Sequence, residues 1–369
     1  MLPHEVISAG PVVLRTPEKS DVDAITRACA DPDIARFIPL VPSPYTRDDA
    51  LMWITELAPG GWEAGGAEFV IAGPGDGEFL GVIGLKPVDR LGNGEIGYWV
   101  APWARGRGVA TAAVRALSEW AFAHGLPRLA LLAEVENVVS QRVAYAAGFE
   151  REGVLRGAQT SRDGSRADVV AFARLATDPG DPVPPFLPFF PGGFPGGSLT
   201  DGVVLLTPLT TGDAADYQAV ASVPDVVEHH VPPVTPDYAE TVARCRHAGH
   251  RWLAGQMASI AIRDAETGAF AGDAQLTNII PPLRQAMVGY SLHPRYRGRG
   301  FMTRTVNLLI EWAFDNTSLR RIVAGTAPDN TASHRVLERA GFTREVLVKD
   351  LLPGPGGTRV DDLQWARTR

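Results

Sequence analysis

The sequence predicts two tandem α/β (α+β) domains, each with a mixed sheet flanked by helices on both faces. The first observation is a repeat, in which three segments recur in one order: VVLRTP at 12–17 and VVLLTP at 203–208, GYWVAPWARGRG at 97–108 and GYSLHPRYRGRG at 289–300, and NVVSQRVAYAAGF at 137–149 and NTASHRVLERAGF at 330–342. The second is that strand-like runs and amphipathic helical stretches are mixed within each copy. A period of about 190 residues is far too long for a solenoid, so the copies are tandem domains.

The proposed boundaries follow from the repeat and from a change in composition. We assign residues 1–177 to the first domain, 178–202 to a linker and 203–369 to the second domain. The linker is so rich in proline and glycine that neither a helix nor a central strand can persist there. Its apolar residues indicate attachment to a domain surface. They are Phe186, Leu187, Phe189, Phe190 and Phe194.

Each copy opens with a strand, at 12–17 in the first copy, and two helical stretches follow. Three strands come next, and the third, GEIGYWVA, leads into the Arg-Gly segment. Apolar residues then recur at three- and four-residue spacing from Val109 to Ala121, which predicts an amphipathic helix with Gly125 as its C-cap. A strand, a helix and a hairpin complete the copy.

Composition narrows the class of protein. The chain of 369 residues is 45% hydrophobic and 21% charged, with a formal net charge of −7. This acidic balance argues against nucleic-acid binding and favours cationic substrates such as amines. Cys29 and Cys245 have no metal-ligand spacing, so we expect reduced thiols and no metal site. Without a signal peptide or a membrane span, we expect a cytoplasmic protein, either a monomer or a homodimer.

The repeated Arg-Gly-Arg-Gly segment predicts an anion site. It lies between a strand and a helix, where the first-turn N–H groups lack helical partners and the helix dipole adds positive character. Glycine lets the backbone approach a phosphate, and arginine adds charged donors. The segment has neither the Lys-Ser/Thr ending of a nucleoside-triphosphate loop nor the glycine spacing of a dinucleotide site. One copy alone could be a solvated turn, but its recurrence in the same context argues against that.

RGRGVA at 105–110 resembles the R/Q-x-x-G-x-G/A signature of the GNAT acetyltransferase superfamily, and the Asn-x-x-Ser and Gly-Phe segments resemble its Rim-type branch, which includes N-terminal acetyltransferases of ribosomal proteins. The resemblance covers both copies. It implies a mostly antiparallel sheet, acetyl-CoA as cosubstrate and an amine acceptor, either a peptide N-terminus or a small molecule. It also implies direct attack without a covalent enzyme intermediate.

The resemblance assigns cofactor-binding positions in both copies. In the first copy they are Trp99, Val100, Arg105, Gly106, Arg107, Gly108, Val109, Ala110 and Asn137. In the second copy they are Leu292, Arg297, Gly298, Arg299, Gly300, Phe301, Asn330 and Ser333. The loop residues would contact the diphosphate, the strand backbone near Trp99 and Val100 would hold the developing oxyanion, and the asparagine would contact the pantetheine arm.

Two side chains are candidates for proton transfer. Glu95 precedes the GYWV strand end and would share one face with Gly97 and Trp99, so it is a candidate general base or else a solvated carboxylate. The resemblance to the Rim-type branch implies that Ser140 protonates the sulfur; Ser140 could also be a helix cap, and the two roles can coexist. The second copy has Met287 at the position of Glu95, so we expect the first copy to be the main catalytic centre.

Two other functions remain open at this stage. The donor could carry a longer acyl group or be bound to a carrier protein, because a phosphopantetheine arm looks alike in both cases. Alternatively, the chain could bind or sense acyl-CoA without catalysis, which suits the second copy better. We read Tyr145 as a packing or surface residue, and the adjacent pair His229 and His230 as surface residues.

Overall fold

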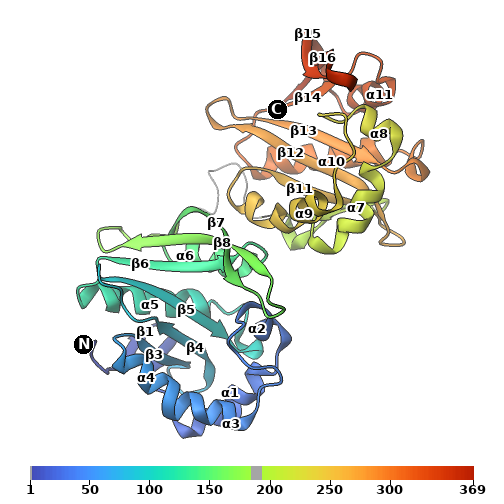
Figure 1. Cartoon of the computed structure of the whole chain (residues 1–369). Helices are drawn as coiled ribbons and strands as arrows, with labels where there is room; N and C mark the ends of the chain where they lie inside the picture. The colour runs from blue at the N-terminus through green and yellow to red at the C-terminus, as the bar shows by residue number, and fades with distance from the viewer. Residues whose placement is uncertain (1, 184–192) are drawn as a thin grey trace. The chain divides into compact units, whose positions relative to one another are not determined.

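The computed structural model describes residues 2–183 and 193–369, and the chain divides into two units, residues 1–184 and 185–369. Each unit contains one eight-stranded sheet with helices packed on it (Figure 1). The predicted class of fold, two tandem mixed sheets flanked by helices, is therefore confirmed. Of the linker residues that we expected to attach to a surface, Phe186, Leu187, Phe189 and Phe190 lie outside the described residues.

In the first unit the strand order is β1-β2-β3-β4-β5-β6-β8-β7. The strands are β1 (Ile7–Ala9), β2 (Val12–Arg15), β3 (Ala67–Ala72), β4 (Phe79–Leu85), β5 (Asn93–Val100), β6 (Arg128–Glu134), β7 (Glu150–Thr160) and β8 (Arg166–Leu175). The helices are α1 (Val22–Cys29), α2 (Pro32–Phe37), α3 (Arg47–Met52), α4 (Ala58–Glu63), α5 (Val109–Ala123) and α6 (Val138–Ala146). Neighbouring strands are antiparallel except β5 and β6, which are parallel.

The long helix α5 shows why its sequence folds as predicted. Its apolar positions Val109, Ala113 and Leu117 are buried, and it ends just before Gly125, which has a φ of +89°. Trp120 of α5 meets Phe69 of β3 edge-on, with ring centroids 5.6 Å apart. Phe69 therefore points to the α5 side of the sheet. Because side chains alternate along a strand, its neighbours in β3 point to the other side.

The second unit repeats this plan in the order β15-β16-β14-β13-β12-β11-β10-β9. Its strands are β9 (Leu199–Thr200), β10 (Val204–Pro208), β11 (Ala258–Asp264), β12 (Phe270–Ile280), β13 (Gln285–Leu292), β14 (Arg321–Thr326), β15 (Thr343–Pro353) and β16 (Arg359–Thr368). Its helices are α7 (Ala214–Ala221), α8 (Pro224–Glu228), α9 (Tyr238–Leu253), α10 (Phe301–Asn316) and α11 (Thr331–Arg339). Here β13 and β14 form the parallel pair.

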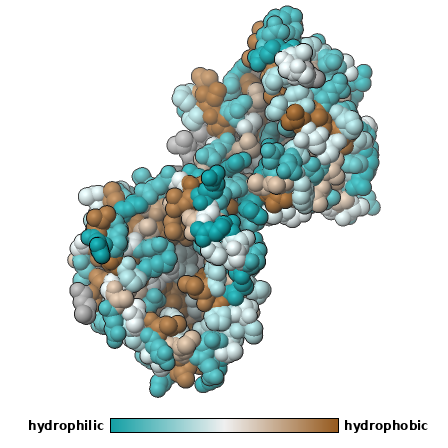
Figure 2. Space-filling view, viewed as in Figure 1, coloured by the Kyte–Doolittle hydropathy of each residue, from teal (hydrophilic) through white to brown (hydrophobic). Residues whose placement is uncertain are grey.

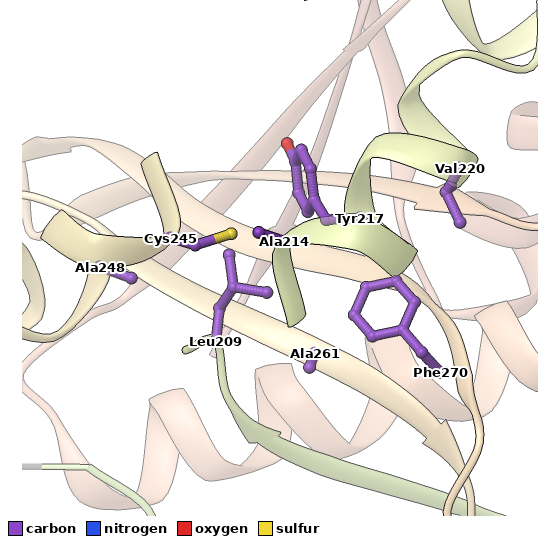
Figure 3. Packing of buried hydrophobic residues seen from close by; sticks show 8 residues of the cluster. All are labelled: Leu209, Ala214, Tyr217, Val220, Cys245, Ala248, Ala261 and Phe270. Carbon is purple, nitrogen blue, oxygen red and sulfur yellow. The ribbon is translucent and has the colours of Figure 1, made fainter. Parts of the chain in front are cut away.

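A buried apolar cluster holds α7 and α9 against the second sheet. Tyr217 comes from α7, Cys245 and Ala248 come from α9, and they pack with Ala261 and Phe270 of the sheet (Figure 3). Cys245 is buried, and burial raises the pKa of its thiol to about 11, so it stays protonated at neutral pH. The two helices thus cover the face of the sheet opposite to α10.

The second unit begins upstream of residue 203. Phe194 is 6% exposed and meets Trp252 and Trp312 edge-on, with centroids 5.2 and 5.0 Å away. The short strand β9 follows, within the range that we expected to be linker. This part of the predicted linker is therefore attached to the second unit, as its aromatic content indicated.

The surface mixes polar and apolar residues. On the face shown in Figure 2, hydrophilic side chains surround apolar residues that stand in small groups. Among residues 2–183 and 193–369, no helix combines the length and the hydrophobicity that a membrane span requires. In the same residues, no group of three or more His, Cys, Asp or Glu side chains is arranged to hold a metal ion.

Candidate active site

The parallel strand pair opens into a wedge in both units. Strand β5 pairs with β6 only as far as Ile96 and Leu131, although β5 continues to Val100. In the second unit the pairing ends at Met287 and Val323, although β13 continues to Leu292. Beyond these last pairs, the described residues supply no partner strand on that side. An extended ligand could therefore form hydrogen bonds with the exposed strand edge.

Backbone alternation identifies which peptide groups face the wedge. The carbonyl of Glu95 and the N–H of Ala101 both bond to β4, at 2.9 Å each, so the odd-numbered residues between them also face β4. Val100 and Tyr98 face the wedge instead. Of the two strand positions that we expect near the oxyanion, Val100 directs its N–H into the wedge and Trp99 directs its N–H to β4. By the same argument Leu292 faces the second wedge, because His293 bonds back to Ala271.

The Arg-Gly loop follows immediately and has the same backbone in both units. Gly106 and Gly108 have φ of +73° and +75°, and Gly298 and Gly300 have +72° and +79°. These left-handed conformations strain any residue with a Cβ atom, which explains the glycines. Gly108 and Gly300 are the N-cap residues of α5 and α10.

The N–H groups of this loop are available to a ligand. Among the described residues, those of Gly106, Arg107 and Gly108 donate no hydrogen bond, and the same holds at the equivalent positions 298–300. The N-terminus of α5, a helix of 15 residues, adds the partial positive charge of the helix dipole. This donor set matches the chemistry of an anion such as a diphosphate.

Acidic residues hold the loop arginines in both units. Arg105 lies 3.2 Å from Asp31 and 3.6 Å from Asp33, at the start of α2. Its counterpart Arg297 pairs with Asp225 at the start of α8 and holds the pKa of that carboxyl below its usual range.

The second arginine of each loop has a looser partner, which is Glu78 at 3.7 Å for Arg107 and Asp264 at 3.8 Å for Arg299. A bound diphosphate would have to share these cations with the carboxylates. The predicted phosphate contacts of the arginines therefore remain a prediction.

Helix α6 brings the predicted Ser140 beside β5. Asn137 is the N-cap, and its Oδ1 accepts from the N–H of Ser140 at 3.1 Å, so Asn137 rather than Ser140 caps the helix. The Ser140 hydroxyl is 2.8 Å from the hydroxyl of Tyr98, and burial raises the pKa of that phenol. Sequence reasoning missed Tyr98, which is 42 residues from Ser140.

The second unit repeats this arrangement less tightly. Asn330 caps α11 by accepting from the N–H of Ser333 at 3.1 Å. Burial raises the pKa of Tyr290 to about 12, and Ser333 lies beside it. Among the described residues, however, the Tyr290 hydroxyl has no hydrogen bond of normal geometry. The predicted Ser333 is therefore in place but is not anchored as Ser140 is.

Glu95 lies where the alternation predicts, but it is not free. It shares a face of β5 with Gly97 and Trp99. Its Oε1 is 2.5 Å from Nζ of Lys86, the residue that follows β4. A base at this position would have to give up that ion pair before it could accept a proton. The tyrosine that we assigned to packing, Tyr145, is buried against Phe172 with ring centroids 5.1 Å apart.

Two glycines that sequence reasoning missed shape the strand end. A Cβ atom on Gly81 would lie 2.3 Å from the carbonyl oxygen of Trp99, and one on Gly272 would lie 2.2 Å from that of Ser291. Only glycine permits this approach of β4 to β5 and of β12 to β13. The signal was present, because both glycines follow the first two residues of matching strands, FLG and FAG.

Each unit also carries an unexpected carboxyl with a raised pKa on the sheet face opposite to the long helix. In the first unit it is Glu68 of β3, whose pKa burial raises to about 7. In the second it is Asp273 of β12, whose pKa burial raises to about 6 against the opposing effects of Arg244, His230 and Ser291. Sequence reasoning did not single out Glu68 as a candidate base.

Comparison with known proteins identifies the family. The model described as "Acetyltransferase (GNAT) domain" matches residues 12–150 and 204–343. Together these segments cover most of the chain, and each contains one wedge and one Arg-Gly loop. The chain belongs to the GNAT acetyltransferase domain family and contains that domain twice.

Curated relatives match over shorter segments. The probable N-acetyltransferase YjcK of Bacillus subtilis is 43% identical over 67 residues, which is 18% of this chain and 37% of that protein. The ribosomal-protein-serine acetyltransferase of Escherichia coli is 34% identical over 100 residues, 27% of this chain and 55% of that protein. The matched part thus spans roughly half or less of these relatives. The solved structure of RimL, a ribosomal L7/L12 alpha-N-protein acetyltransferase in complex with coenzyme A, is 21% identical, with a TM-score of 0.42 over 45% of this chain and 94% of that one.

Proposed function

We propose that this protein transfers an acetyl group from acetyl-CoA to a primary amine, with the first unit as the main catalytic centre. The observation that carries the proposal is the continuity of the wedge and the loop. The edge of β5 that lacks a partner ends at Val100, and the free N–H groups of residues 106–108 follow within one turn. A thioester with an extended arm and a diphosphate requires both features side by side.

The chain's own residues would hold the donor in two ways. Backbone N–H groups of the loop and the first turn of α5, from Gly106 to Ala110, would bind the diphosphate. The wedge-facing backbone of Tyr98 and Val100 would bind the arm as an added strand, with Asn137 at the N-cap of α6 as a further contact. When bound, acetyl-CoA supplies the activated acyl carbon, and the N–H of Val100 would stabilise negative charge on the acyl oxygen.

Proton transfer at the sulfur is the proposed role of Ser140. Its hydroxyl is hydrogen-bonded to that of Tyr98, so a proton given up by serine can be replaced from the phenol. A leaving thiol has a pKa of about 8.5, so a nearby donor favours its departure. The acceptor that we propose is a peptide α-amine or a small-molecule amine, since an α-amine of pKa ~8 needs less help from a base than lysine. The names of relatives that act on ribosomal proteins are consistent with a peptide.

One observation favours a different function for the second unit, namely acyl-CoA binding without transfer. Its loop has the same backbone as the first, but the side chain of Gln275 lies against Gly289 on the face where the acceptor would enter. A longer acyl group or a carrier-bound donor remains an alternative for the first unit, because the same loop and wedge would serve it.

Calorimetry and a thiol-release assay test this proposal on the full chain. We expect heat of binding with acetyl-CoA and release of free thiol when an amine is added, with the acetylated product identified by mass spectrometry. A panel should include amino acids, peptides with different N-termini and polyamines. Binding without thiol release on any amine would replace the enzyme by a sensor, and absence of binding would overturn both functions.

A further inference from the structure

We infer that Glu68, reached along a slot floored by Gly84 and Gly97, accepts the proton of the attacking amine in the first unit. This inference rests on the proposed acetyl transfer and gives it a catalytic residue that is distinct from the predicted Glu95. It also limits the acceptor to an amine on an arm slim enough to lie on bare backbone.

The strand register places the three residues in one row. Glu68 of β3 is opposite Gly84 of β4, and Gly84 is opposite Gly97 of β5. Residues that are directly opposite one another point to the same face of the sheet. This face is the one opposite to α5, because the neighbouring Phe69 packs on Trp120.

Missing side chains make the row into a slot. A Cβ atom on Gly84 would lie 2.4 Å from Oε2 of Glu68, so the carboxylate lies over that glycine. A Cβ atom on Gly97 would have no atom within 4 Å, so the space beside the carboxylate is open. Since neighbouring strands are about 4.8 Å apart, the carboxylate is roughly one strand spacing from β5, whose far edge is the wedge.

The Glu68 carboxylate has no partner within the described part of the chain. It forms no hydrogen bond or ion pair, although the side chain is half-buried. An unpaired carboxyl in such surroundings favours its neutral form, which is why its pKa rises to about 7. A base of this pKa is half ionised near neutral pH and can both take up and release a proton.

The charged groups around Glu68 are occupied or exposed. On the same face, Lys86 and Glu95 pair with each other. Arg15 at the end of β2 is held by Asp21 at 2.7 Å. Helix α4, which packs on β3, has Glu63 as its one titratable side chain, and that residue is exposed.

The second unit shows the same face with the slot closed. Ser259 takes the position of Glu68, and Gln275 takes the position of Gly84. The Nε2 atom of Gln275 is 3.0 Å from where a Cβ atom of Gly289 would be, so it fills the space that is open above Gly97. Arg244 of α9 fixes the amide there, at 2.5 Å from Oε1. The unit without a base at this position is thus also the unit without an entrance.

The proposed step balances as follows. The lone pair of the neutral amine forms a C–N bond with the acyl carbon, the C–S bond breaks, and its electron pair leaves on sulfur. Glu68 accepts the N–H proton, and the sulfur takes up a proton from Ser140 or water. Glu68 then returns its proton to solvent, and the serine hydroxyl, where it was the donor, regains a proton from solvent by way of Tyr98, so the net products are an amide and a free thiol.

Four variants of the full chain test the inference, namely Glu68→Gln, Gly84→Gln, Ser259→Ala and Glu95→Gln. We expect Glu68→Gln to lower kcat at pH 8 by about 100-fold or more, to leave KM for acetyl-CoA unchanged and to remove a rise in kcat near pH 7. We expect Gly84→Gln, which copies the second unit, to abolish calorimetric binding of the amine to the CoA-bound protein while acetyl-CoA still binds. Ser259→Ala, the matched control in the second unit, should change neither quantity.

The outcomes separate this inference from the proposed function. If the wild type turns over an amine and Glu68→Gln retains both the rate and the rise near pH 7, Glu68 is not the base and acetyl transfer still stands. If Glu95→Gln removes that rise instead, Glu95 is the base and the inference is overturned. Unchanged amine binding in Gly84→Gln overturns the slot. A wild type that binds acetyl-CoA but acetylates no amine overturns both.

Discussion

The first unit leaves a strip of backbone bare beside a glutamate, whereas the second covers the same strip with a glutamine held by an arginine. On the other side of each strand end, the two units scarcely differ. Their loop glycines agree in φ within a few degrees, and both first loop arginines are held by an aspartate at the start of a short helix.

In the proposed function, this contrast separates two kinds of recognition. The donor side depends on backbone groups, which tolerate sequence change as long as the glycines remain. The acceptor side depends on particular side chains, so a few substitutions between the copies, such as Gly84 to Gln275 and Glu68 to Ser259, suffice to change its chemistry. On that proposal, this chain has two donor loops and one acceptor slot.

Glycine substitution in the loops gives the largest expected effect. Gly108→Val forces a β-branched residue into φ of +75° and displaces the N–H groups, so we expect kcat/KM to fall by about 100-fold. Gly300→Val imposes the same strain in the second unit and should leave kcat/KM within about twofold. Steady-state kinetics decides, with thermal unfolding as a control for folding. Equal losses in the two variants would contradict the assignment of catalysis to the first unit.

The pH dependence of stability gives an intermediate effect. Because the pKa of Glu68 is raised to about 7 in the folded state, its contribution to the free energy of unfolding is fully present below pH ~4.5. This contribution is lost as pH rises through 7. Glu68→Gln removes this loss, so we expect a gain on the order of 2 kcal/mol at pH 8 and little change at pH 4. That corresponds to about 5 °C in the Tm of the first unit.

Asp273→Asn provides the comparison in the second unit. The pKa of Asp273 is raised to about 6, so its ionisation lowers the free energy of unfolding as pH rises to about 6. This window lies below that of Glu68. We expect a smaller gain, because the variant also weakens attraction to Arg244 and His230. Calorimetric scans from pH 4 to pH 8 would show both windows. A gain for Glu68→Gln that does not depend on pH would contradict the buried-carboxyl explanation.

Removal of one hydroxyl gives the smallest effect. Tyr98→Phe deletes the 2.8 Å hydrogen bond to Ser140 and should cost about 1 kcal/mol. Tyr290→Phe deletes a buried hydroxyl that lacks a well-formed hydrogen bond and should be neutral or slightly stabilising. Denaturant titration of the two variants measures the difference. A cost for Tyr290→Phe equal to that for Tyr98→Phe would show that both tyrosines are anchored alike.

Much of the fold, and the backbone of the loop that we propose for the donor, could be predicted because their signals are local. The repeat, the helix from Val109 and the loop glycines each depend on residues that are close in sequence. Glu68 could not be found in this way. Its environment depends on Gly84 in the neighbouring strand β4. It also depends on the register that places Gly97 of β5 in the same row. A lone glutamate in an apolar strand carries no sign of which residue it will face.

The same limit explains the interpretation of Glu95. Alternation correctly placed its side chain, but Lys86 meets it only because β4 and β5 are antiparallel neighbours. The choice between the peptide groups of Trp99 and Val100 was open for a related reason. A periodic pattern tells which way a side chain points, whereas the direction of a peptide N–H depends on which neighbouring strand it bonds.

The packing of Phe194 has a practical consequence for dissecting the protein. A recombinant second half that starts at residue 203 would lack β9 and leave the indoles of Trp252 and Trp312 uncovered. Starting at or before Gly193 retains this aromatic cover. Comparing the solubility of two such truncations would show whether residues 193–202 are part of the folding unit, before either half is assayed alone.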